Sequence, residues 1–177
     1  MDLLVPPIYA VMRNASVPTT LRTSSISLLA DCVDKSPLAM LPYVQDLSLG
    51  LIDLLQVETV PEKPTIKLSK EEESQEEEEA TPVDPSMDSE PTARNSKFPP
   101  LRRAALHFLS LLIRASTKLA YDDNSSTTAD IFPRSTFQRA DITLGYVAST
   151  DEDNVVRVMA REARENLEQL QQALIGL

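Results

Sequence analysis

One packing pattern occurs three times in the chain, and this repetition constrains the fold more than any other feature. The pattern places an arginine after an aliphatic residue, with small or apolar residues three, six and ten positions later. Its occurrences are Arg22/Ser25/Leu28/Cys32, Arg102/Ala105/Phe108/Leu112 and Arg157/Ala160/Ala163/Leu167. These positions share one side of an α-helix, with the small residue where another helix comes close. The recurrence predicts an all-α fold, an α-solenoid of about six helices in which each unit packs against its neighbours.

The composition agrees with helices and excludes some functions. Of the 177 residues 42% are hydrophobic, which is enough for a core, and Trp is absent, so the core is expected to consist of Leu, Ile, Val and Ala. Three glycines are too few for a hairpin-rich β fold. The formal charge of -10 argues against a general nucleic-acid-binding protein, which needs clustered Lys and Arg to neutralise phosphates.

Residues 58–97 differ in character from the rest of the chain. They contain five prolines and twelve acidic against five basic residues, with few apolar ones. Such a segment cannot bury enough apolar surface to fold, so we expect a disordered acidic linker between helices in 1–57 and helices in 98–177. Without these 40 residues, the interval of 80 from Arg22 to Arg102 becomes 40, the period of HEAT repeats.

Apolar periodicity, prolines and caps predict six helices. Ser16 is a candidate N-cap for the second, and the acidic residues at 150–153 favour the start of the last through the helix dipole. We expect the second and third helices, joined by a short turn, to form an αα-hairpin. The expected helices are 3–13, 18–34, 38–57, 101–120, 133–149 and 154–175.

The inventory of reactive residues does not indicate an enzyme. His107 is the only histidine, which excludes a multi-histidine metal site, and Cys32 on the apolar side of its helix is expected to be a buried structural thiol. No glycine-rich phosphate loop occurs, and the glutamates at 71–79 are interpreted as a solvated charge run. We therefore predict no catalytic, cofactor or metal site.

Three hydroxyl residues in the acidic segment are candidate phosphorylation sites. Ser69, Ser74 and Thr81 each have an acidic residue three positions later, the spacing that acid-directed kinases favour. Phosphate would add negative charge to a segment already suited to a basic partner. The hypothesis is that residues 58–97 regulate partner binding.

The three arginines of the packing pattern allow two interpretations. Arg22, Arg102 and Arg157 would form a basic row for a ligand, or each guanidinium would bind the acidic turn of an adjacent unit. Their place within a packing pattern favours the structural role. Asp151 or Asp153 is the expected partner of Arg157.

The N-terminal residues do not resemble a targeting signal. Residues 1–12 lack a basic region and are interrupted by Pro6 and Pro7, and no segment is expected to approach the roughly 20 apolar residues of a membrane span. The sequons at Asn14 and Asn124 are then chance matches, and we expect a protein of the cytoplasm and nucleus. The abrupt start within a helical pattern also suggests the end of a longer solenoid.

Three segments carry a resemblance to a known family. Residues 150–160 are similar to the HEAT signature, an acidic turn followed by Val-Arg-x-x-Ala. Together with Pro100–Leu106 and Leu41–Val44, they resemble the C-terminal region of the RNA polymerase II assembly and nuclear-import factor family, which includes the transport and Golgi organisation protein. Ser25 in place of alanine and Arg164 in place of an aliphatic residue depart from the ideal pattern.

The resemblance implies a non-enzymatic HEAT-repeat scaffold without a cofactor. Its protein partners would be RNA polymerase subunits, assembly chaperones and nuclear pore proteins, bound along a curved face of stacked helices. An alternative is a scaffold in Golgi or membrane traffic that has no polymerase client. An enzyme is the least favoured class because the chain offers so few reactive residues.

Overall fold

The computed structural model describes residues 1, 3–59, 98–122 and 132–175, and all regular structure within these ranges is helical. This confirms the all-α prediction, and six of the helices are long. The elements are α1 (Val5–Arg13), α2 (Thr19–Lys35), α3 (Pro37–Met40), the 3-10 helix η1 (Leu41–Tyr43), α4 (Val44–Thr59), α5 (Pro99–Asp122), α7 (Arg134–Thr150) and α8 (Asn154–Ile175).

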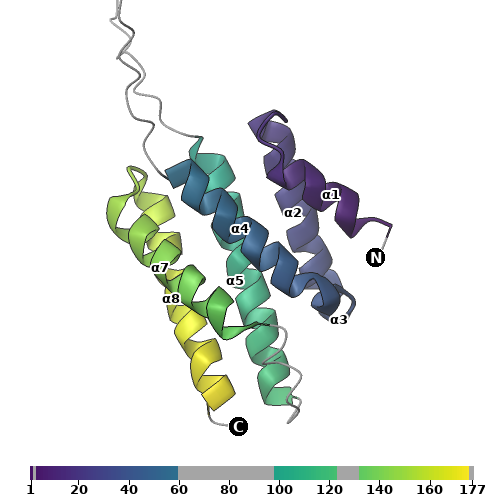
Figure 1. The fold of residues 1–177 in the computed structure, drawn as a ribbon, viewed down its shortest axis with the longest axis vertical. Helices are drawn as coiled ribbons and strands as arrows, with labels where there is room; N and C mark the ends of the chain where they lie inside the picture. Colours follow the sequence, from purple (N-terminus) through teal and green to yellow (C-terminus); the bar gives the residue numbers. More distant parts are fainter. Residues whose placement is uncertain (2, 60–97, 123–131, 176–177) are drawn as a thin grey trace, which may run out of the picture.

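The long helices lie in two layers. Helices α1, α4 and α7 lie side by side in front, and α2, α5 and α8 lie behind them (Figure 1). Each front helix packs against the back helix that follows it, which gives the pairs α1/α2, α4/α5 and α7/α8. Within the back layer α5 contacts both α2 and α8, so consecutive pairs are joined through both layers.

The expected hairpin of helices 18–34 and 38–57 is wrong. Pro42 has no N–H group to donate to the carbonyl oxygen of Leu38, four residues earlier, and its ring clashes with that carbonyl in a regular α-helix. The second segment therefore divides into α3, η1 and α4. Helix α2 packs chiefly against α1 and α5 instead. Ser16 is also not the cap of α2, because Pro18 occupies the N-cap position without a side-chain hydrogen bond.

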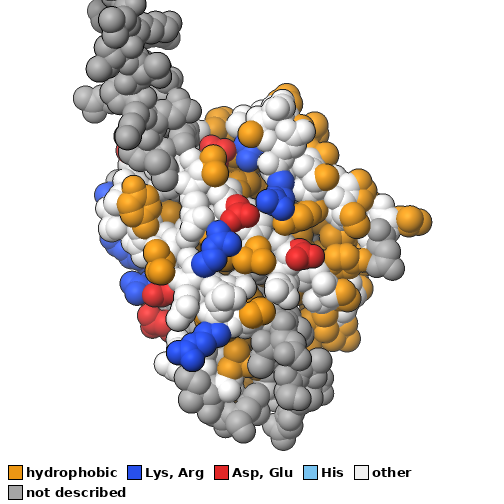
Figure 2. All heavy atoms as spheres, in the orientation of Figure 1, with side chains coloured by type: hydrophobic (Ala, Val, Ile, Leu, Met, Phe, Trp, Pro, Cys, Tyr) orange, Lys and Arg blue, Asp and Glu red, His pale blue; other side chains and the backbone are white. Residues whose placement is uncertain are grey.

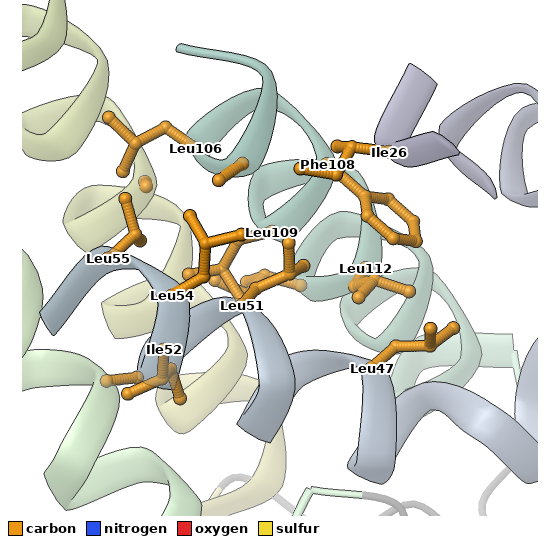
Figure 3. Packing of buried hydrophobic residues seen from close by; sticks show 14 of the residues in the cluster. Ile26, Leu47, Leu51, Ile52, Leu54, Leu55, Leu106, Phe108, Leu109 and Leu112 are labelled. Carbon is orange, nitrogen blue, oxygen red and sulfur yellow. The ribbon is translucent and has the colours of Figure 1, made fainter. Parts of the chain in front are cut away.

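The core is one continuous cluster that extends from α1 to α8. Leu51, Leu54 and Leu55 of α4 face Leu106 and Leu109 of α5 (Figure 3). In the same view Phe108 of α5 lies beside Ile26 of α2. Helix α5 therefore packs against α4 with one set of side chains and against α2 with another. The core is mainly aliphatic, as the composition predicts, with buried Phe108 and Phe132 as its largest side chains.

Among the residues that the structure describes, one segment has the length and hydropathy of a membrane span, contrary to the expectation that none approaches it. Residues Pro37–Thr59 have a mean hydropathy of 1.4 in their most apolar window, and half of that window is buried in the protein. Its buried leucines, including Leu47, Leu51 and Leu55, belong to the core. Burial against neighbouring helices accounts for the apolar composition of this segment.

Helix α4 continues two residues into the range assigned to the linker. Glu58 and Thr59 are helical, whereas residues 60–97, where the acidic linker and the three candidate phosphorylation sites Ser69, Ser74 and Thr81 were expected, lie outside the described part of the chain. The last helix has the bounds expected from the sequence, Asn154–Ile175.

Candidate functional site

The three occurrences of the packing pattern occupy equivalent places in the structure. Arg22, Arg102 and Arg157 are each the fourth residue of a back-layer helix, in α2, α5 and α8. The small residues Ser25, Ala105 and Ala160 that follow them are all buried. The repetition read from the sequence therefore corresponds to three successive helices of one layer.

Arg102 joins the second helix pair to the third. Its Nε lies 2.7 Å from Oδ2 of Asp151 and its Nη2 donates to Oδ1 at 3.0 Å, so the guanidinium binds the carboxylate through both oxygens. The two side chains are only 5% and 1% exposed. Because Asp151 is the C-cap residue of α7, this buried ion pair fixes the α7–α8 turn against the start of α5.

Arg22 makes the corresponding connection between the first and second pairs. Its Nη1 lies 3.1 Å from Oε1 of Glu58 in the last turn of α4, and both side chains are largely buried. Its Nε donates to the carbonyl oxygen of Met12 in α1 at 3.0 Å. Arg22 therefore binds both front-layer helices that flank α2.

Arg157 does not bind either of its predicted partners. Its guanidinium donates to Oδ1 of Asn154 in its own helix, whereas Asp151 binds Arg102 and Asp153 binds Arg103. Both acidic residues precede α8 and face the preceding back-layer helix. Arg22 and Arg102, by contrast, each bind an acidic residue of the next pair, and only Asp151 belongs to an acidic turn.

Asp153 combines an ion pair with a helix cap. The hydrogen bond from Arg103, whose Nη2 lies 2.5 Å from Oδ2, and the backbone N–H of Val156, 2.9 Å from Oδ1, hold the pKa of Asp153 below its usual value of 3.8. The charged carboxylate thereby stabilises the N-terminus of α8. This confirms that the acidic turn favours the start of the last helix.

The front layer carries a row of polar contacts that the sequence does not reveal. Asp53 of α4 lies between two cations, with Arg13 Nη2 of α1 at 3.5 Å and Arg139 Nη2 of α7 at 2.6 Å. Gln56 accepts from Arg139 at 3.2 Å and donates to Oγ1 of Thr143 at 2.9 Å. Figure 2 shows charged side chains of both signs across this face. The partners are too distant in sequence for any local spacing to pair them.

Helices α1 and α4 approach closely at Tyr9 and Gly50. The Tyr9 hydroxyl donates to the carbonyl oxygen of Asp46 at 2.9 Å, and a β-carbon on Gly50 would lie 2.6 Å from Cε2 of Tyr9. Burial raises the pKa of Tyr9 above 10.0, more than the adjacent Arg13 lowers it. Gly50 is therefore required by the contact rather than by a turn.

The remaining candidate residues show no catalytic arrangement. His107 is exposed on α5, and Cys32 is half-buried rather than buried as expected. Among the described residues no group of three or more His, Cys, Asp or Glu side chains is placed to hold a metal ion. An open hollow of about 600 Å³ between α7 and α8 is lined by Phe132, Phe137, Leu167 and charged neighbours, without a nucleophile beside a base.

Comparison with known proteins gives no relative: no family model, curated protein or solved structure matches this chain.

Proposed function

We propose that this chain is part of a HEAT-type α-solenoid that acts as a non-enzymatic scaffold for protein partners. The observation that carries the proposal is the equivalence of α2, α5 and α8. Each has the pattern arginine as its fourth residue, and two of these arginines bind an acidic residue of the next helix pair. Stacked units of this kind bury their apolar faces only against neighbours and present long surfaces to partners.

The uncovered side of α5 is the proposed contact surface. Arg103, His107, Arg114 and Lys118 follow one another at intervals of four, seven and four residues, which places them on one side of the helix. His107, Arg114 and Lys118 are exposed, whereas the other sides of α5 pack against α2, α4 and α8. A basic strip along the middle helix of the back layer favours an acidic, extended segment of a partner protein.

The proposed clients follow from the family resemblance. The chain would hold RNA polymerase II subunits during their assembly and nuclear import, together with assembly chaperones and nuclear pore proteins, in the cytoplasm and nucleus. A scaffold in Golgi or membrane traffic is the alternative that the same family suggests.

Affinity capture with matched variants tests this proposal. The immobilised full chain is compared with R114E/K118E on the α5 strip and with R134E/R161E, a control that reverses two exposed charges on α7 and α8. Circular dichroism melts verify that all three are equally folded. We expect polymerase II subunits or their chaperones to bind the unmodified chain and the control and to be lost from R114E/K118E.

Other outcomes separate the alternatives. Recovery of coat or Golgi proteins alone would contradict the polymerase proposal and support the trafficking scaffold. Equal recovery on all three chains would exclude the α5 strip as the contact surface. Deletion of residues 60–97, which leaves the Glu58 ion pair intact, tests the separate hypothesis that Ser69, Ser74 and Thr81 lie in a regulatory segment.

A further inference from the structure

In α5 the packing pattern lies on the side of the helix that meets the preceding back-layer helix, α2. In α5 and α8 the residue before the arginine and those three, six and ten positions after it are all buried. These residues are Leu101, Ala105, Phe108 and Leu112 in α5, and Val156, Ala160, Ala163 and Leu167 in α8. Figure 3 shows Phe108 beside Ile26 of α2, so the sixth position faces the preceding helix.

In α2 Ser25 is also buried, but the positions equivalent to Leu101 and Phe108 are exposed. Leu21 is 52% exposed and Leu28, equivalent to the fully buried Phe108, is 47% exposed. Cys32 is half-buried although its equivalents in α5 and α8 are buried. Leu21, Leu28 and Cys32 define the α2 outer face, and among the described residues no helix covers Leu21 and Leu28. Leu3 and Leu4 before α1 and Leu38 in α3 are also exposed, and Figure 2 shows hydrophobic side chains around α1 and α3.

Asn14 provides a polar contact at the same end. It is the C-cap residue of α1, as Asp151 is of α7, and both have extended backbone conformations. In each case Oδ1 accepts the backbone N–H two residues later at 2.9 Å, from Ser16 and from Asp153. Asp151 also binds the arginine of the preceding pair, whereas Asn14 is exposed with acceptor capacity left on its amide oxygen.

The opposite end of the stack has a different chemistry. Four, seven and eleven positions after the arginine, α2 and α5 present buried aliphatic residues, Ile26, Leu29 and Val33 in α2 and Leu106, Leu109 and Ile113 in α5. At these positions α8 has the exposed residues Arg161, Arg164 and Glu168. If a second copy stacked head to tail, its α8 would place these charged residues on Leu21 and Leu28. If two copies instead met through their α2 outer faces, Asn14 would have no equivalent of Arg102 to bind.

From these equivalences we infer that the α2 outer face receives the second helix of another helix pair of the α4/α5 type. That helix carries aliphatic residues four, seven and eleven positions after an arginine, and this arginine donates to Asn14 Oδ1. The inference rests on the proposed repeat scaffold and adds a specific partner surface to it. The occupant is a helical repeat, not a second copy of this chain.

Extension of the full chain by a copy of its own repeat tests the inference. Copies of residues 44–59 and 98–122, joined by flexible linkers, are placed before Met1. Cys32 is the only cysteine of the extended chain, so its rate of reaction with a maleimide reports whether the α2 outer face is covered. We expect labelling to slow by about tenfold or more, because exchange then requires local opening of the junction.

Two matched extensions make the result specific. A copy with the α8 pattern, in which the residues equivalent to Leu106, Leu109 and Ile113 become Arg, Arg and Glu, should leave the labelling rate at that of the unextended chain. In the correct extension Asn14→Asp should slow labelling further by creating an ion pair like that of Asp151, whereas it should have little effect without the extension.

Equal labelling of the two extended chains would overturn the inference. So would a dimer of the unextended chain in sedimentation experiments that Leu28→Glu dissociates, because a second copy would then be the occupant. The partner-capture experiment uses the unextended chain and substitutions on α5, so the proposed function and this inference can fail separately.

Discussion

Arg102 of α5 and Asp151 at the end of α7 form a buried ion pair, with Nε 2.7 Å from Oδ2 and a hydrogen bond of 3.0 Å from Nη2 to Oδ1. Both side chains are almost fully buried, so water could not solvate the charge of either one if the other were removed. This ion pair therefore fixes the third helix pair relative to the second. Removing either residue leaves the charge of the other buried and uncompensated.

Arg102→Ala should destabilise the protein strongly. The substitution leaves Asp151 buried without its cation, and such changes lower the free energy of unfolding by about 3–5 kcal/mol. Arg103→Ala is the matched control, because Arg103 is 41% exposed and its surface pair with Asp153 is expected to contribute about 1 kcal/mol or less. Urea denaturation measures both. Similar losses for the two variants would show that burial does not govern this pair.

Gly50→Ala and Gly145→Ala should have opposite effects on stability. At Gly50 the new β-carbon would meet Tyr9 at 2.6 Å, and displacing the ring breaks its hydrogen bond to Asp46, a cost of about 1–3 kcal/mol that exceeds the gain in helix propensity. At Gly145 the nearest atom is 3.9 Å away, so about 1 kcal/mol of propensity is gained. Thermal melts of both variants test this. A stabilised Gly50→Ala variant would show that α1 and the Tyr9 ring can move away from the new β-carbon without a loss of stability.

Ser48→Ala should increase stability. The Ser48 hydroxyl in α4 is fully buried and has no hydrogen-bond partner among the described residues, so its removal saves about 1 kcal/mol of desolvation. Ser116 in α5 is equally buried but donates to the carbonyl oxygen of Leu112 at 2.9 Å, so Ser116→Ala should not stabilise. Unfolding free energies of the two alanine variants compare them directly, and a loss of stability at Ser48 would reveal a partner for its hydroxyl.

The contribution of Asp153 to stability should disappear in acid. Its pKa is lower in the folded protein than its ordinary 3.8, so its stabilisation is present above that pH and is lost as the pH falls through the folded-state value. Asp153→Asn keeps an oxygen that caps α8 but loses the charged pair with Arg103. The stability difference between protein and variant should be largest near neutral pH and shrink below pH 3.8, as urea denaturation at several pH values would show. A difference that is independent of pH would exclude the charge as its source.

Local patterns in the sequence predict most of the long helices and the equivalence of three of them, but not the division of residues 38–57 into α3, η1 and α4. The bounds of α8 and the helix content follow from periodicity and capping residues, which act over a few positions. The buried positions Ala105 and Ala160 follow from the same pattern. Residue type alone also predicts the acidic turn before α8, because a carboxylate at a helix start is stabilised by nearby N–H groups.

Contacts between distant helices could not be derived in this way. The arginine nearest to Asp151 in the sequence is Arg157, yet the carboxylate of Asp151 binds Arg102. The reason is that the packing of the helix pairs brings the α7–α8 turn over the start of α5. By composition Glu58 belongs to the acidic linker, although α4 extends far enough to bring it to Arg22. Gly50 has no local signal either, since its role depends on Tyr9.

Hydrogen exchange measured by mass spectrometry tests the central claim, that the helix pairs form a stack in which each pair depends on its neighbours. In Arg22→Ala, protection should fall in α1, α2 and α4 and be retained in α8, whereas in Arg102→Ala it should fall in α5, α7 and α8 and be retained in α1. If each substitution instead increased exchange equally in all the long helices, the protein would behave as one closed bundle and the stacked scaffold would be contradicted.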